Sequence, residues 1–135
     1  MPFPALHHVA LTVRDLSVSV PWYETLFEAE PVIDEDTDPA MHHTVYLLDG
    51  TLVGLHQHEK AASAERFSEF NVGLDHVSFG CADRAALEGW QRRLDELGIE
   101  HGGIKTAHYG SGISFRDPDN IALEFFAPPA PVSTS

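Results

Sequence analysis

A tandem repeat constrains the fold of this chain more than any other feature of its sequence. Residues 6–15 align without gaps on residues 74–83, at an offset of 68 residues. The same offset relates Trp22 to Trp90 further along the chain. Self-similarity at a fixed spacing indicates one supersecondary unit that is used twice. The chain is therefore expected to fold as two related modules.

Each module is predicted to contain a strand, a helix and three further strands, which makes the chain an α+β fold of two tandem βαβββ modules. Alternating apolar residues predict the opening strands, and turn residues separate the later ones. The first module is expected to cover residues 5–58 and the second residues 73–127. A polar connection at 59–72 and a Pro/Ser-rich tail at 128–135 complete this single domain.

Boundary residues place the helices within the modules. Pro21 cannot lie deep inside a helix, so the first helix is predicted to begin near Ser19. Asp83 is a good N-cap for the second helix, and Gly98 is a good C-terminal stop. The three later strands are expected near residues 31–34, 43–48 and 51–57 in the first module and near 103–106, 112–116 and 121–126 in the second.

Composition and charge limit the possible partners. The chain has 135 residues, of which 43% are apolar, as in ordinary globular proteins. A formal net charge of −13 repels phosphate backbones and acidic membranes, so neither nucleic acid nor membrane is expected as a partner. The single cysteine, Cys81, excludes an internal disulfide, and with no secretory signal visible a cytoplasmic location is expected.

Two equivalent histidines and one glutamate suggest a metal site. His8 and His76 open the two modules on strand faces that carry small or polar residues, which suits a cavity wall. Glu124 lies between apolar residues of the last strand, where a carboxylate is costly to bury unless it is paired or ligating. Two imidazoles and a carboxylate leave open positions on Fe, Mn, Zn or Ni. The alternative is two hydrogen-bonded core histidines and a chance glutamate.

The chain resembles the vicinal oxygen chelate (VOC) superfamily, which includes glyoxalase I, bleomycin-resistance proteins, fosfomycin-resistance enzymes and extradiol dioxygenases. The resemblance covers nearly the whole chain and rests on residues 8–16, 22–23, 74–77 and 117–124. It implies that the two modules form a cupped, incomplete barrel, usually in a homodimer, with a divalent metal inside the cup. His8, His76 and Glu124 fall on the metal-ligand positions of the family.

Departures from the family patterns leave the reaction open. Glyoxalase I-like members usually add a Glu ligand where this chain has Gly54. Extradiol dioxygenases and fosfomycin-type members usually place a Tyr where this chain has Ser114. Bleomycin-binding members usually lack the metal ligands, whereas this chain keeps all three.

Other polar residues are candidates for catalysis and substrate binding. His56 is predicted to share a strand face with Gly54 and to act as a general base or an extra ligand; the alternative is a solvated histidine at a strand end. Tyr46 lies 68 residues before Ser114, so it is predicted to occupy the mirror position and supply a catalytic phenol. The alternative for Tyr46 is a packed aromatic with a hydrogen-bonded hydroxyl. The candidate substrate-binding residues are Thr12, Ser78, Ser114, Tyr109 and Arg116.

The sequence is compatible with two functions, an enzyme and a binding protein. The first is a metal-dependent enzyme, glyoxalase- or dioxygenase-like, that acts on a small oxygen-chelating organic substrate; lyase, isomerase and dioxygenase chemistry are not distinguished. The second is a binding protein of the bleomycin-resistance type that sequesters a drug or metabolite without chemistry. The small and polar residues expected on the cup face favour the enzyme.

Overall fold

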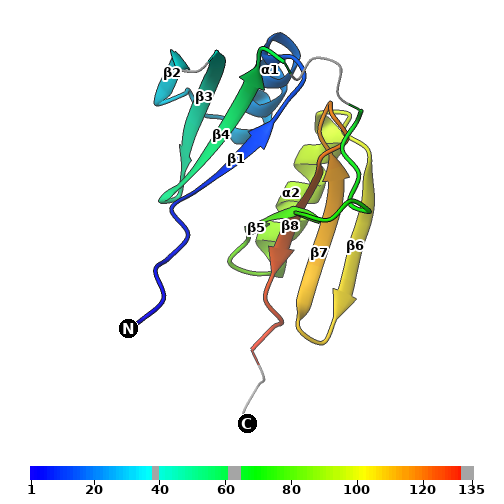
Figure 1. Cartoon of the computed structure of the whole chain (residues 1–135). Coiled ribbons are helices and arrows are strands. Elements are labelled where there is room, and N and C mark those ends of the chain that lie inside the picture. Colours follow the sequence, from blue (N-terminus) through cyan, green and yellow to red (C-terminus); the bar gives the residue numbers. More distant parts are fainter. Residues whose placement is uncertain (38–39, 61–64, 132–135) are drawn as a thin grey trace. The chain divides into compact units, whose positions relative to one another are not determined.

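The structure is a computed structural model that describes residues 1–37, 40–60 and 65–131. It divides into two compact units, Met1–Glu65 and Arg66–Ser135. Parts of the predicted connection and tail, residues 61–64 and 132–135, lie outside the described residues. In Figure 1, each unit is a four-stranded sheet with one helix against it. None of the described helices is long and apolar enough to cross a membrane.

Unit 1 has the predicted βαβββ order. Its sheet has the strand order β1-β4-β3-β2, with β1 parallel to β4 and the other neighbours antiparallel. The elements are β1 (His8–Thr12), α1 (Leu16–Phe27), β2 (Ile33–Thr37), β3 (Met41–Leu48) and β4 (Thr51–His58).

Unit 2 repeats this topology with the strand order β5-β8-β7-β6, again with one parallel pair, β5 and β8. The two tandem βαβββ modules predicted from the repeat are therefore confirmed. The elements are β5 (Val77–Gly80), α2 (Arg84–Glu96), β6 (His101–Ala107), β7 (Gly110–Arg116) and β8 (Ala122–Ala127).

Helix α1 begins three residues earlier than predicted, at Leu16, and contains Pro21. Asp15 caps it, because its carboxylate accepts hydrogen bonds from the backbone N–H and the hydroxyl of Ser17. Pro21 removes the N–H that would bond to the carbonyl of Ser17, but both residues are exposed and water can satisfy that carbonyl. Helix α2 begins after Asp83 as predicted, and Asp83 accepts from Ala86 N–H.

Strand β2 lies further along the chain than its sequence pattern predicted. It was expected at residues 31–34 but spans Ile33–Thr37, with three consecutive acidic residues. It is an edge strand and almost wholly exposed. Charged residues are common on such edges because they prevent further strand pairing. An exposed strand of this kind lacks the apolar alternation on which the prediction relied.

The hydrophobic core of each unit lies between the helix and one face of the sheet. In unit 1, Tyr23 and Leu26 of α1 and Tyr46 and Leu55 of the sheet are almost fully buried. In unit 2, Trp90 of α2 stacks on Phe125 with ring centroids 4.4 Å apart. We call the opposite face of each sheet, which points away from the helix of its own unit, the open face.

Candidate metal and substrate site

His76 and Glu124 meet on the open face of the second sheet. His76 directly precedes β5, and the parallel pairing of β5 with β8 places Ser78 opposite Glu124. The Nε2 atom of His76 lies 3.7 Å from Oε1 of Glu124. Two donors bound to one ion at ~2.1 Å, with angles of ~90–120°, lie roughly 3.0–3.6 Å apart. The observed spacing is close to that of two ligands of one ion.

Neighbouring residues orient this pair for ligation. His76 Nδ1 lies 2.7 Å from the carboxylate of Asp75, which favours the tautomer that leaves the Nε2 lone pair available for an ion. The Ser78 hydroxyl donates to Oε1 of Glu124 at 2.8 Å. The half-buried carboxylate of Glu124 is thereby held in place, and Oε1 keeps a second lone pair for an ion.

His8 has a similar arrangement within unit 1. Its Nδ1 atom lies 2.8 Å from Nδ1 of His7, and when His8 is the donor of this hydrogen bond its Nε2 lone pair is left for a ligand. Over the residues that the structure describes, no three His, Cys, Asp or Glu side chains gather closely enough to hold a metal ion. The donor chemistry and spacing of His76 and Glu124 fit a divalent metal. His8, the predicted third ligand, lies in unit 1.

His56 lies in a cluster of histidines on the open face of the first sheet. Its ring centroid is 5.6 Å from that of His43 and 6.2 Å from that of His58. Burial lowers the pKa of His56, and the nearby imidazoles of His43, His58 and His8 lower it further. Its ring is therefore mainly neutral at pH 7, the state in which a histidine accepts a proton.

The glycine next to His56 on the same strand face is what gives its ring room. A Cβ atom built on Gly54 would lie only 3.2 Å from Nε2 of His56. The imidazole thus extends over the position where glyoxalase I-like relatives are expected to carry a glutamate ligand. A side chain at position 54 would have to displace it. The placement agrees with the expected open-face location of His56.

Tyr46 does not lie on the open face, and its predicted mirror relation to Ser114 was wrong by one residue. Strand pairing joins Val45 to Gly54, just as Ser114 pairs with Glu124, so Val45 is the true counterpart of Ser114. A shift of one residue moves a strand side chain to the other face. Tyr46 is fully buried on the helix side.

Interactions of Tyr46 with α1 give it a structural role. Its hydroxyl donates to the carboxylate of Glu24 at 2.9 Å. Burial first, and then Glu24, raise the pKa of the phenol far above its usual value. Both the position and the pKa disfavour the catalytic role expected for this residue.

The candidate substrate residues are distributed over both open faces. Ser78 and Ser114 lie on either side of Glu124 in one cross-strand row. Thr12 is exposed and pairs with His56 in unit 1. Arg116 is engaged within unit 2, since its guanidinium lies 2.5 Å from the Glu69 carboxylate and donates to a backbone carbonyl.

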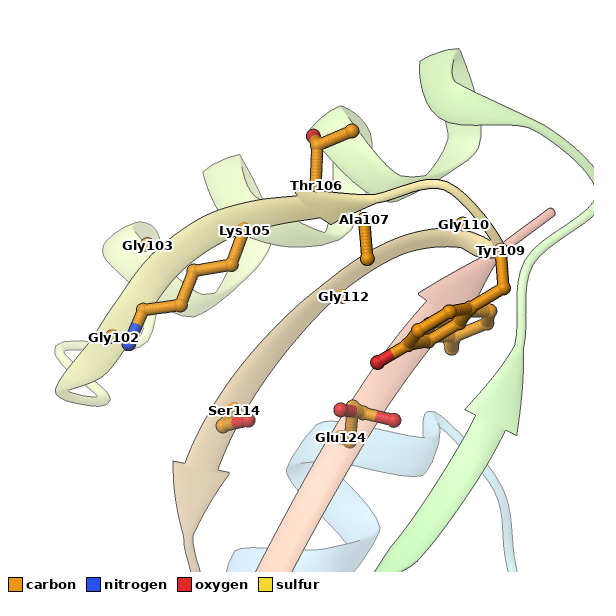
Figure 2. A pocket seen from close by; sticks show the side chains of 11 residues that line it. Gly102, Gly103, Lys105, Thr106, Ala107, Tyr109, Gly110, Gly112, Ser114 and Glu124 are labelled. Atoms are coloured by element: carbon orange, nitrogen blue, oxygen red, sulfur yellow. The ribbon is translucent and has the colours of Figure 1, made fainter. Parts of the chain in front are cut away.

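A small pocket of about 190 Å³ lies on the open face of unit 2. Figure 2 shows Tyr109 on the right, with the hydroxyl directed to the side where Glu124 lies, and Lys105 on the left along β6. Lys105 was not among the residues singled out by the sequence, although it is one of only two lysines in this acidic chain. The lining residues are Gly102, Gly103, Lys105, Thr106, Ala107, Tyr109, Gly110, Gly112, Ser114, Glu124 and Phe126.

Comparison with known proteins gives a consistent result. FosB, a metallothiol transferase of Bacillus licheniformis, is 27% identical over 122 residues, which span 88% of this chain and 72% of FosB. A glyoxylase/bleomycin resistance protein/dioxygenase domain from Frankia sp. EAN1pec superimposes with a TM-score of 0.85 and 29% identity, covering 95% of this chain and 94% of that chain.

A third similar structure is the fosfomycin resistance protein FosX from Listeria monocytogenes, complexed with Mn(II) and sulfate. It has a TM-score of 0.68 and 19% identity, covering 96% of this chain and 95% of that chain, so it supports the fold alone. Residues 5–125 match the sequence profile of the Glyoxalase/Bleomycin resistance protein/Dioxygenase superfamily. The chain therefore belongs to this superfamily, also called the vicinal oxygen chelate superfamily.

Proposed function

We propose that this protein is a metal-dependent enzyme that acts on a small organic substrate with metal-chelating oxygens. His8, His76 and Glu124 would bind one divalent ion, which is Fe, Mn, Zn or Ni. The observation that carries the proposal is the His76–Glu124 pair, with an Nε2–Oε1 distance of 3.7 Å and with Asp75 and Ser78 orienting the two ligands. Mn(II) is the first ion to test, because it is present in the FosX complex.

The bound ion would act as a Lewis acid that stabilises negative charge on the substrate oxygens. The remaining functions fall to side chains of this chain. Ser78 and Ser114 flank Glu124 and can donate hydrogen bonds to substrate oxygens. Thr12 is placed to do the same beside His56. Arg116 would contribute to substrate binding only by exchanging its contact with Glu69.

His56 is the proposed proton-transfer residue. Its lowered pKa keeps the ring neutral near pH 7, so it can accept a proton from substrate or water. Gly54 provides the space that its ring requires. Tyr46 is not proposed for this step because it is buried on the helix side and bonded to Glu24.

We further propose that the protein works as a homodimer in the cytoplasm. Apart from the acidic strand β2, the edge strands are β1, β5 and β6, which carry no run of acidic residues, and such edges are usually covered. A single cysteine suits a reducing compartment. Light scattering at micromolar concentration should give the mass of two chains, and a monomer mass would contradict the assembly.

Metal analysis tests the proposed function directly. The protein, purified without chelator and loaded with Mn(II), should retain about one ion per chain after dialysis. His76→Gln should lose it. His101→Gln is the matched control, because His101 also pairs with a carboxylate in unit 2, at 2.6 Å from Asp95, and should retain the ion.

Turnover then separates an enzyme from a binding protein. The loaded protein should be assayed on a panel of small oxygen-chelating compounds, including fosfomycin with a thiol, hemithioacetals and catechols. Metal-dependent turnover of any of them supports the enzyme. Equal ligand binding by the loaded and metal-free proteins, with no turnover on the panel, would support the sequestering protein instead.

A further inference from the structure

One cross-strand row on the open face of unit 2 alternates between large and absent side chains. Strand pairing places Lys105 opposite Gly112, and Gly112 opposite Phe126. Lys105 and Phe126 therefore project from strands on either side of β7, roughly 9–10 Å apart. Gly112 between them has no side chain, and the Phe126 ring and the Glu124 carboxylate lie close to its backbone. All four residues line the pocket of about 190 Å³.

We call the pocket between Lys105 and the Phe126 ring the slot, and Gly112 forms part of its floor. A Cβ atom on Gly112 would lie 3.1 Å from Oε2 of Glu124 and 3.2 Å from Cδ2 of Phe126. A side chain at position 112 would therefore have to shift one of these two groups. The slot also ends beside the carboxylate of Glu124, so a molecule lying in it would reach the proposed metal ligand.

One wall of the slot is a pair of parallel aromatic rings. Tyr109 stacks on Phe126 with centroids 6.0 Å apart and an interplanar angle of 15°. This close approach depends on a second glycine, since a Cβ atom on Gly110 would lie 2.5 Å from the Phe126 ring. Tyr109 is still 64% exposed. Flat aromatic surface of this kind favours a planar ligand.

The other wall carries a positive charge. Lys105 is exposed, and it forms no ion pair within residues 1–37, 40–60 and 65–131. The chain has only 8 Lys and Arg against 21 Asp and Glu, so an unpaired ammonium in a pocket is unusual here. Arg116, one of the candidate substrate-binding residues, is paired with Glu69.

We propose that this slot binds a planar organic anion, with the unsaturated or aromatic body against Tyr109 and Phe126 and the anionic group on Lys105. The volume of about 190 Å³ is below the roughly 300–1,000 Å³ of sites for drug-sized ligands, so it suits a body of about one ring. The proposal rests on the proposed function in one respect: the substrate oxygens that chelate the metal would lie at the Glu124 end of the slot.

Three probe molecules separate charge from shape. Benzoate is planar and anionic, benzamide is planar and neutral, and cyclohexanecarboxylate is anionic and puckered. Each is titrated into metal-free, isotope-labelled protein and followed by amide chemical shifts. We expect benzoate to bind in the millimolar range, at least about fivefold more tightly than either analogue, and to shift the amides of Lys105, Tyr109 and Gly112.

Two variants and a matched control complete the test. Lys105→Met keeps the aliphatic stem and should weaken benzoate about tenfold by removing a charge-assisted hydrogen bond. Tyr109→Leu should reduce the preference for benzoate over cyclohexanecarboxylate. Lys60→Met removes the only other lysine and should leave benzoate affinity unchanged. Equal affinities for the three probes, or equal losses in the two lysine variants, would overturn the proposal.

A Mn(II) binding measurement distinguishes failure of the slot from failure of the proposed metal site. Lys105 is not a proposed ligand, so Lys105→Met should bind Mn(II) like the unmodified protein. Selective benzoate binding without Mn(II) binding would support the slot and reject the metal site. Mn(II) binding without benzoate selectivity would support the metal site and reject the slot.

Discussion

The open faces of the two sheets differ although the sheets share one topology. On the first sheet the open face carries a group of imidazoles, and Gly54 leaves room for one of them, His56. On the second sheet the equivalent of Gly54 is Glu124, which lies between two serines and beside a pocket with a glycine floor. The βαβββ repeat is thus preserved in its framework and diverged at the positions that face away from the helix.

This difference suggests a division of chemical roles. Imidazoles whose pKa is lowered by burial and by one another suit proton transfer. A carboxylate held by Ser78 next to His76 suits an ion, and the neighbouring slot suits a ligand. The helix side of each sheet instead packs against one helix, with Tyr23, Leu26 and Tyr46 buried in unit 1 and Leu87, Leu94 and Ile113 buried in unit 2. Variants on one open face should therefore affect proton transfer, and variants on the other should affect ion and ligand binding.

Removing the imidazole of His56 should have the largest effect on turnover. His56→Ala is expected to lower kcat by ~10²–10⁴ on the substrate found by the panel, as for a lost general base. His58→Ala, on the same strand and more exposed, is the control and should change kcat by less than about threefold, since a neighbouring solvated imidazole is not the proton acceptor. Full activity of His56→Ala would end the assignment of proton transfer to the first sheet.

Loosening the orientation of the two ligands from unit 2, His76 and Glu124, should weaken metal binding. Asp75→Asn and Ser78→Ala remove the groups that hold His76 and Glu124. Changes of this kind typically weaken metal binding by ~10–100-fold. Calorimetric titration with Mn(II) measures the loss, and His42→Gln, which changes a His–carboxylate contact on unit 1, serves as the control. Unchanged Mn(II) affinity in both variants would contradict the orienting role of Asp75 and Ser78.

Tyr46 should matter for stability and not for activity. Tyr46→Phe leaves the Glu24 carboxylate without its donor, so the free energy of unfolding should fall by about 1–3 kcal/mol. Urea denaturation measures this change. Turnover should stay within about twofold, since the phenol is on the helix side and not near the proposed proton transfer. A large loss of turnover in a variant that is still folded would restore the catalytic role.

The smallest expected effect is on the pKa of His56, on the open face of the first sheet. The pKa of His56 is lowered from 6.5 by burial and by neighbouring imidazoles, so its ring should titrate below pH 6.5 in a histidine-detected NMR titration. His43→Gln removes the largest electrostatic cause and should raise the pKa toward 6.5 while leaving the burial effect. Because the folded-state pKa is lowered, His56 should favour folding less as the pH falls below 6.5. A pKa above 6.5 would contradict this.

The same comparison explains what the sequence could predict. The repeat predicted both modules, the alternation of β1 placed His8 and Thr12 on the open face, and the caps placed α2. Tyr46 was assigned to the wrong face because the offset of 68 residues between β1 and β5 becomes 69 between β3 and β7 (Val45 to Ser114). Strand faces alternate at every residue, so an error of one residue reverses the face. Side-chain spacing across strands depends on pairing register, which an offset taken from β1 does not provide.

Lys105 was missed and β2 was placed too early for a different physical reason. A lysine on an exposed strand has the same local pattern whether it is solvated or lines a pocket, and only the pairing with Gly112 distinguishes the two. Strand β2 is held by its partner β3 and not by apolar residues of its own. In both cases the determining interaction comes from a neighbouring strand.

A Mn(II) titration of two variants, one from each open face, tests the division of roles most directly. Glu124→Gln should weaken binding by more than about 100-fold, because losing a ligand exceeds the ~10–100-fold effect of losing an orienting group. His56→Ala should bind Mn(II) within about threefold of the unmodified protein, since the imidazole is assigned to proton transfer and not to the ion. Equal losses in the two variants, or no loss in Glu124→Gln, would contradict the account.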